Sequence, residues 1–240
     1  MKISIKSDYR EMSKEAAGIV ADAIRAKPNL VLGLATGSTP LGMYKELIRI
    51  HKEEGLDFSQ VVTFNLDEFC GVSPNDKQSY HYYMYENLFS HININPQNIH
   101  IPDGNVEEAE EFCRIYDKMI EEHGPIDLQV LGIGRNGHIG FNEPADKLAV
   151  DTHVTPLAEE TRRVISNFFD KWENVPKKAI TMGLGAIMKA KKILLLANGK
   201  KKVDIMRKFI KDRHVTTKLP ASFLHLHPNV TVVMDKEAAG

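Results

Sequence analysis

The sequence predicts an α/β protein with an open, mainly parallel sheet and helices on both faces. Short, unbroken apolar runs recur along the chain, as expected of strands that are buried on both sides. Between them lie longer segments in which apolar residues return every three or four positions, which is typical of helices packed against a sheet. Alternation of these two patterns favours a Rossmann-like arrangement in a single domain, residues 1–240.

The predicted elements can be followed along the chain. The first helix is the clearest, because Ala16, Ile19, Val20 and Ala23 recur at three- and four-residue steps and form one apolar stripe. The segment "HPNVTVVMD" near the end of the chain fits either an edge strand or a strand at an interface. In order, we expect helix 9–26, strand 30–35, helix 40–54, strand 61–66, helices 79–89 and 105–123, strands 127–134 and 192–197, helix 200–211 and strand 230–235.

Composition excludes several classes of protein. The chain has 240 residues, of which 42% are hydrophobic and 26% charged, and a net charge of −1. This balance argues against electrostatic binding to nucleic acid or to a membrane surface. The N-terminus lacks a signal-peptide pattern and no apolar run has the ~20 residues that a bilayer requires, so we expect a cytoplasmic protein. Cys70 and Cys113 have no metal-ligand spacing, which disfavours a disulfide framework or a zinc site.

Three unusual loops follow predicted strands. They read "ATGSTP" (35–40), "NLDEFCG" (65–71) and "GRNGHIGFNEP" (134–144). Ligands of open parallel sheets bind outside the carboxyl ends of the strands, so the three loops should line one pocket.

The first loop can bind a phosphate. Gly37 allows a tight turn, Ser38 and Thr39 supply hydroxyls, and we expect Thr39 to cap the helix that starts near Pro40. The free N–H groups of such a helix start attract anions. No Gly-Lys-Ser/Thr follows, which disfavours a nucleoside triphosphate. From this loop alone, a capped helix without any ligand fits equally well.

The second loop begins with two adjacent acids, Asp67 and Glu68. Neighbouring side chains of an extended chain diverge, so we expect one working carboxylate and one structural partner. A carboxylate shielded from water can act as a general base. The alternative is an exposed strand end with two solvated acids.

The third loop combines His138, Glu143 and Asn136 with three glycines, and Gly132 lies just before it. Histidine exchanges protons near neutral pH, Glu143 could orient its ring, and Asn136 could add an uncharged hydrogen bond. His138 and Glu143 make only two metal ligands, so we expect no metal. The three loops together predict proton transfer on a small phosphorylated metabolite, without a cofactor.

Four segments resemble those of the glucosamine-6-phosphate deaminase family: "LGLATGSTPLGMYKEL", "VVTFNLDEF", "SYHYYM" and "LGIGRNGHIGFNEP". The likeness extends over nearly the whole chain. The related 6-phosphogluconolactonases typically lack the "FNEP" continuation, which stands here at Phe141–Pro144. The resemblance implies that D-glucosamine 6-phosphate and water become D-fructose 6-phosphate and ammonia, a step of amino-sugar and N-acetylglucosamine catabolism. A galactosamine-6-phosphate deaminase/isomerase or a lactonase are the alternatives, and a non-catalytic sugar-phosphate sensor is disfavoured.

The resemblance also implies roles for single residues. Asp67 is similar to the base that takes the C2 proton, His138 to the residue that moves a proton during ring opening, and Glu143 to the acid that supports this histidine. Asn136 would contribute a hydrogen bond. The phosphate ligands would be Gly37, Ser38, Thr39 and Lys202.

Two departures from the family pattern lead to further expectations. Asn167 stands where many members carry a phosphate-binding arginine, so we expect Arg162, Arg163 or Lys202 to compensate. The segment after Pro144 lacks the basic and hydroxyl residues of members activated by N-acetylglucosamine 6-phosphate, which predicts little allosteric activation. Residues 144–175 are expected to form a mobile lid. A homo-oligomer is compatible with the sequence.

Overall fold

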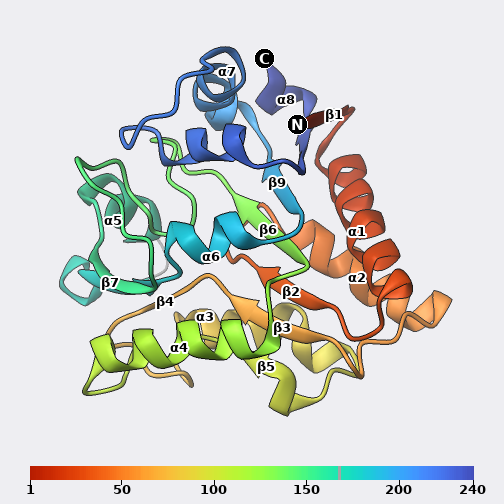
Figure 1. Ribbon diagram of the computed structural model, residues 1–240, viewed down its shortest axis with the longest axis horizontal. Coiled ribbons are helices and arrows are strands. Elements are labelled where there is room, and N and C mark those ends of the chain that lie inside the picture. Colours follow the sequence, from red (N-terminus) through yellow and green to blue (C-terminus); the bar gives the residue numbers. More distant parts are fainter. Residues whose placement is uncertain (167–168) are drawn as a thin grey trace.

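The central feature of the computed structural model, which describes residues 1–166 and 169–240, is a seven-stranded sheet. Every neighbouring pair of strands in it is parallel, in the order β1-β10-β9-β6-β2-β3-β5 (Figure 1). The predicted fold class is therefore confirmed. The strands are β1 (Lys2–Lys6), β2 (Val31–Leu34), β3 (Val62–Asn65), β5 (Ile99–His100), β6 (Leu128–Gly132), β9 (Ile193–Ala197) and β10 (Val230–Asp235).

Helices cover both faces of this sheet. The apolar sides of α1, α2 and α3 form one core with the strands, and those of α4, α6, α7 and α8 form another on the opposite face. In Figure 1, α1 and α2 lie together on one side of the strands, and α4 and α6 on the other. The helices are α1 (Tyr9–Ala26), α2 (Leu41–Glu54), α3 (Tyr80–Asn87), α4 (Ala109–His123), α5 (Glu159–Ile165), α6 (Leu184–Lys189), α7 (Val203–Lys211) and α8 (Lys236–Ala239).

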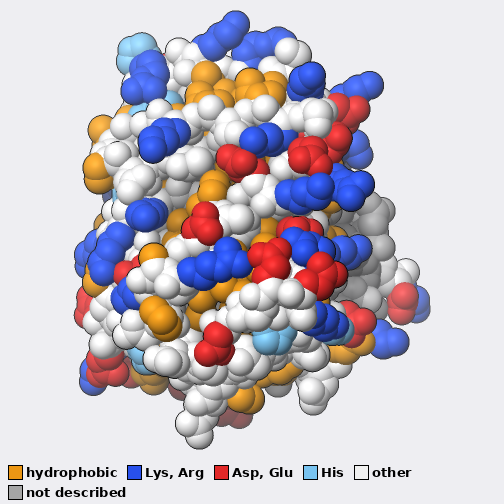
Figure 2. All heavy atoms as spheres, turned by 90° about the vertical axis from the view of Figure 1, so that its right-hand side faces the viewer, with side chains coloured by type: hydrophobic (Ala, Val, Ile, Leu, Met, Phe, Trp, Pro, Cys, Tyr) orange, Lys and Arg blue, Asp and Glu red, His pale blue; other side chains and the backbone are white. Residues whose placement is uncertain are grey.

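Local sequence explains where the longer helices begin and end. The side chain of Asp8 accepts a hydrogen bond from the backbone N–H of Glu11 at 2.9 Å and so caps α1. Gly55 ends α2 with a φ of +70°, which glycine adopts without strain. Charges of both signs are interspersed on the side of the molecule formed by α1 and α2 (Figure 2). On α2, Arg49 pairs with Glu53 and Glu54. No helix in the described ranges is long and apolar enough to cross a membrane.

All five predicted strands and all five predicted helices are present, with ends shifted by up to a few residues. Residues 230–235 form the predicted strand, β10, but the edge-strand alternative was wrong, because β10 is paired on both sides, with β1 and β9. The edge is formed by β1, whose isoleucines Ile3 and Ile5 remain largely exposed and gave no buried-strand pattern. The short helices α5, α6 and α8 were not predicted, since their four to seven residues hold too few turns for a clear apolar stripe.

A second, three-stranded antiparallel sheet was also not predicted. It consists of β4 (Asp67–Phe69), β8 (Lys178–Thr181) and β7 (His153–Pro156), in that order. Asp67 pairs with Thr181 in this sheet, more than 100 positions along the chain. The small sheet therefore fixes the backbone of the second loop at the point where it leaves β3.

The strand order reverses at the centre of the large sheet. From β2 the chain builds outward to β3 and β5, then returns to β6 on the other side of β2 and continues to β9 and β10. The loops that follow β2 and β6 consequently diverge and leave a crevice between them. In open α/β sheets this switch point is where ligands bind.

Candidate functional site

A cavity of about 460 Å³ lies at the carboxyl ends of β2, β3, β6 and β9. Its walls come from the three predicted loops, from the segment before α3, from α5 and from Lys202. Seven of the eight predicted site residues line it: Gly37, Ser38, Thr39, Asp67, Asn136, His138 and Lys202. Glu143 does not line the cavity but lies behind His138, to which it is hydrogen-bonded.

Asp67 is a buried carboxyl group with no cation beside it. Its residue is 6% exposed, and no lysine, arginine or histidine nitrogen of the described residues lies within 4.0 Å of its carboxylate. Burial, and secondarily the negative charge of Glu68, raise the pKa of Asp67 to about 8. Such a pKa suits a general base that works near neutral pH.

Glu68 is the structural partner that the sequence predicted. Its carboxylate accepts three backbone N–H bonds, from Phe69 at 2.8 Å, Tyr80 at 2.9 Å and His81 at 2.8 Å. Burial raises the pKa of Glu68 to about 7, against the effect of these three donors, which lower it. The side chain therefore ties the start of α3 to β4, and the two acids have different tasks.

His138 and Glu143 form the expected pair. Nδ1 of His138 lies 3.2 Å from Oε2 of Glu143, and Asn136 donates its amide N–H to the same oxygen at 2.6 Å. The hydroxyl of Thr161, on α5, donates to the other oxygen of Glu143. Burial would raise the pKa of Glu143, but these hydrogen bonds and the proximity of His138 outweigh it and hold that pKa below its usual value. A carboxylate held in this way orients the imidazole.

Glycine lets the imidazole of His138 lie directly on the chain. A Cβ atom at Gly134 would fall 2.4 Å from Cε1 of His138, which leaves no room for any other residue. Gly140 adopts a φ of +56°, and a Cβ there would lie 3.7 Å from Oδ2 of Asp67. The third loop thus packs its backbone against the groups that can move protons.

The first loop is held by two tyrosines. The hydroxyl of Tyr83, on α3, donates to the carbonyl oxygen of Gly37 at 2.6 Å, and that of Tyr9 lies 3.0 Å from the carbonyl oxygen of Ser38. Gly37 has a φ of +95°, as a tight turn requires.

The expectation that Thr39 caps α2 was wrong. Pro40 occupies the cap position without a side-chain hydrogen bond, and the hydroxyl of Thr39 donates to Oδ1 of Asn198 at 2.7 Å. A contact across 159 positions outcompetes the local cap, and it joins the loop after β2 to the loop after β9.

Lys202 reaches the same end of the cavity. Its ammonium group donates to the carbonyl oxygen of Ile133, and it forms no ion pair with any described carboxylate. Burial, and secondarily the charge of Arg135, lower the pKa of Lys202 to about 8. Arg135 also lines the cavity and was not among the predicted residues, although it stands within the "GRNGH" segment.

Neither of the two arginines expected to compensate for Asn167 lines the cavity. Arg162 donates to the carbonyl oxygens of Val175 and Pro176 and lies over the ring of Trp172, and Arg163 pairs with Glu159. Asn167 itself lies outside the described residues.

Other lining residues were missed by the sequence reasoning because they carry no local signal. Thr161 and Ile165 come from α5, and an aromatic wall is formed by Phe69, Tyr80 and Phe141. The ring centroids of Phe69 and Tyr80 lie 4.4 Å apart. These side chains give the polar groups an apolar surround, which strengthens electrostatic effects in the cavity.

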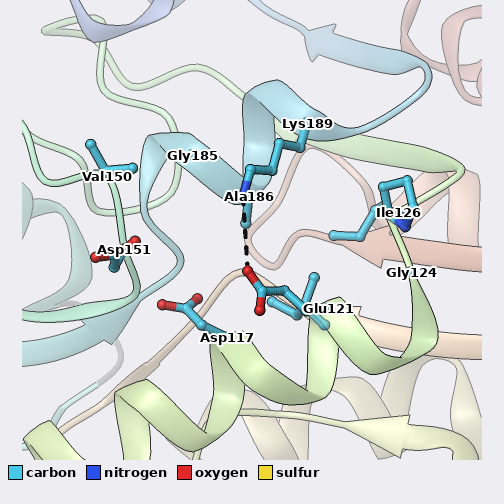
Figure 3. Close-up of a pocket in the computed structure, with 11 residues that line it drawn as sticks. Asp117, Glu121, Gly124, Ile126, Val150, Asp151, Gly185, Ala186 and Lys189 are labelled. Carbon is cyan, nitrogen blue, oxygen red and sulfur yellow. Dashed lines mark ion pairs between the residues drawn. The ribbon is translucent and has the colours of Figure 1, made fainter.

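A second cavity of about 380 Å³ lies between α4 and α6 (Figure 3). Asp117 and Glu121 face it from α4, and Lys189 reaches across from α6, with its ammonium group 3.9 Å from Glu121. None of the predicted site residues and no histidine line it. The predicted site residues therefore gather at the larger cavity and not at this one. Among residues 1–166 and 169–240, no three His, Cys, Asp or Glu side chains gather as metal ligands would.

Comparisons with known proteins agree on a family. A family model described as glucosamine-6-phosphate isomerases/6-phosphogluconolactonase matches residues 6–233. A glucosamine-6-phosphate deaminase of Thermoanaerobacter pseudethanolicus is 59% identical over 239 residues, covering 100% of this chain and 94% of that protein. One of Clostridium perfringens is 50% identical, covering 100% of this chain and 98% of that protein.

Solved structures give the same picture. A structure described as a monomeric glucosamine-6-phosphate deaminase is 48% identical, with a TM-score of 0.97, and the match covers 100% of this chain and 99% of that one. A 6-phosphogluconolactonase of Thermotoga maritima is 24% identical, with a TM-score of 0.71 and 98% of each chain covered, and shares the fold alone.

Proposed function

This chain belongs to the glucosamine-6-phosphate isomerase/6-phosphogluconolactonase family, and we propose that it is a deaminase within it. It converts D-glucosamine 6-phosphate and water to D-fructose 6-phosphate and ammonia. Relatives that carry this name match the full length at 50–59% identity, whereas the lactonase from Thermotoga maritima is only 24% identical.

One observation carries the proposal: an unpaired buried carboxyl group, Asp67, shares a cavity with the histidine of a His138–Glu143 pair. An aldose–ketose isomerisation needs a base that takes a proton from carbon, and a second group that handles the protons of the ring oxygen. These two requirements match Asp67 and His138. A sugar-phosphate sensor would need neither.

The first step is the opening of the pyranose ring, since only the free aldehyde makes the C2 proton acidic. His138 assists by passing a proton to the ring oxygen while Glu143 holds the imidazole in place. Asn136 keeps the Glu143 carboxylate oriented through its 2.6 Å hydrogen bond.

Asp67 then removes the C2 proton. The electrons move to form an enolamine, and a proton is returned at C1, which leaves an imine at C2. Water adds to this imine, ammonia leaves, and the C2 ketone of fructose 6-phosphate remains. The backbone of Gly37 with the hydroxyls of Ser38 and Thr39, together with Lys202, holds the phosphate during these steps.

We further propose that residues 1–240 form one domain and that residues 144–175 act as a lid. Support for the lid comes from α5, which contributes Thr161 to the cavity wall and to Glu143. Proteolysis within 144–175 should slow when a substrate analogue is bound. We also propose a cytoplasmic enzyme with little or no activation by N-acetylglucosamine 6-phosphate. Light scattering will show whether the chain forms the homo-oligomer that the sequence allows.

The decisive experiment measures ammonia and fructose 6-phosphate released from glucosamine 6-phosphate by the purified protein, with Asp67→Asn alongside. Stoichiometric release by the wild type and near-complete loss in the variant are expected. Release from galactosamine 6-phosphate only, or hydrolysis of 6-phosphogluconolactone without ammonia, would assign the chain to one of the alternatives.

A further inference from the structure

Two cations on the wall of the cavity have no carboxylate of the described residues in ion-pair contact. They are Arg135 and Lys202, and the loop Gly37–Thr39 lines the same cavity. No carboxylate of the described residues lies within 4.0 Å of either side chain, and Arg135 donates no hydrogen bond to any of these residues. Elsewhere on the surface, Arg49 and Arg163 each pair with neighbouring glutamates.

The proximity of two like charges is unfavourable in a partly enclosed cavity. The charge of Arg135 is near enough to contribute to the lowered pKa of Lys202, after burial. No carboxylate of the described residues lies within 4.0 Å to offset this repulsion. An anion that binds between the two groups would relieve it, because it would gain from both charges at once.

We propose that Arg135 binds the phosphate group of the substrate and takes the role for which the family pattern suggested an arginine at position 167. This inference rests on the proposed function and adds a residue to its phosphate site. The guanidinium group offers two parallel N–H donors to two phosphate oxygens, and Lys202 offers a third from the other side. The loop Gly37–Thr39 completes the contact.

The charges of ligand and site support this assignment. A phosphate monoester carries about −1.5 to −2 charges at pH 7. Lys202, with a pKa of about 8, loses part of its charge in mildly alkaline solution, whereas arginine stays charged. With Arg135 present, the site keeps a full positive charge at every pH at which Asp67 can act as a base.

The test compares Arg135→Ala with wild type in two measurements. Steady-state kinetics with glucosamine 6-phosphate should show KM raised about 10- to 100-fold, the factor expected for one charge-assisted hydrogen bond, with kcat changed less than about threefold. Calorimetric titration with inorganic phosphate should show a similar loss of affinity. Arg135→Lys should restore part of the KM and part of the phosphate affinity, since it returns the positive charge without the two parallel N–H donors of a guanidinium group.

Arg163→Ala is the matched control, because it removes the same charge from α5, where Arg163 is exposed and paired with Glu159. It should change neither KM nor phosphate affinity by more than about twofold. If Arg163→Ala weakened binding as much as Arg135→Ala, the effect of Arg135 would be only that of its positive charge on the overall electrostatic potential, and the proposal would be overturned. A loss of kcat at constant KM in Arg135→Ala, or an unchanged phosphate affinity, would also overturn it.

The titration separates this inference from the proposed function, because it requires no turnover. If the wild type binds phosphate through Arg135 but releases no ammonia from glucosamine 6-phosphate, the deaminase assignment fails and the phosphate site stands. If the wild type releases ammonia and Arg135→Ala binds phosphate as tightly as the wild type, the deaminase assignment stands and the proposed role of Arg135 fails.

Discussion

Two buried aspartates at opposite ends of the sheet have opposite surroundings. Asp127, just before β6, has ammonium groups of Lys27 and Lys191 within 2.8 Å of its carboxylate and accepts the backbone N–H of Val31 at 2.9 Å. Asp67, just after β3, has no cation beside it and faces the cavity. The two residues are similarly buried, at 7% and 6% exposed.

Their pKa values move in opposite directions. Burial alone would raise that of Asp127, but Lys191, Lys27 and the N–H of Val31 lower it below its ordinary value. Burial raises that of Asp67 to about 8, with no cation to oppose it. The carboxylate of Asp127 is thus neutralised by partners, whereas that of Asp67 is left without them. This difference, more than burial, singles out Asp67 as the proposed base.

The strongest test of this comparison is Asp67→Asn. Loss of the base should lower kcat by about 10²- to 10⁴-fold, because proton transfer by a positioned group contributes that much. The fold should not suffer, since no partner is lost. Steady-state kinetics at pH 7.5 measures kcat, and a thermal melt at the same pH measures the stability of the fold. A clear fall in melting temperature would mean that Asp67 has a structural partner after all.

Glu143→Gln should give the next largest loss. The amide keeps the size of the side chain but removes the charge that orients and supports His138, so kcat should fall about 10- to 100-fold with KM little changed. Thr161→Val, which removes one hydrogen bond to the same carboxylate, serves as the graded control and should lose less. Equal losses in the two variants would contradict the role of the Glu143 charge.

Asp127→Asn should affect stability and spare catalysis. Removal of a buried charge that accepts from two lysines and a backbone N–H should lower the free energy of unfolding by about 1–3 kcal/mol. Urea denaturation measures this, and kcat/KM serves as the control. A stable but inactive Asp127→Asn would show that the two ends of the sheet are not independent.

The pH dependence of stability should differ in sign between the two variants. The folded-state pKa of Asp67 is raised, so its ionisation costs stability progressively as pH rises from about 4 to about 8. Asp67→Asn should therefore melt higher than wild type at pH 8 and close to it at pH 4. The folded-state pKa of Asp127 is lowered, so its contribution is present above pH 4 and is lost as pH falls below it.

The smallest expected effect concerns the pH–rate profile. Asp67 and Lys202 both have a pKa of about 8, so kcat/KM should follow a narrow bell around that pH, rising as Asp67 loses its proton and falling as Lys202 loses its charge. Lys202→Arg keeps that charge and should flatten the alkaline side. An alkaline side that is the same in both proteins would assign it to another group.

Much of the fold could be predicted because parallel strands buried on both faces need unbroken apolar runs. This holds for β2, β3, β6, β9 and β10, and fails for β1 and β5, whose residues remain partly exposed. The three-stranded sheet could not be predicted either, since strands of three or four residues show little periodicity in the sequence. Its pairing of Asp67 with Thr181 is a long-range contact that no local pattern records.

The sequence by itself determined the parallel α/β class and the three loops at one rim of the sheet, and it supplied the residues that we propose to carry protons or hold a phosphate. It could do so because strand burial and loop chemistry are local properties. Only the tertiary structure decided which acid is unpaired, that Thr39 bonds Asn198 and Thr161 bonds Glu143, and that Arg135 stands beside Lys202. These contacts depend on how distant segments pack, and that packing sets the pKa values on which the chemistry depends.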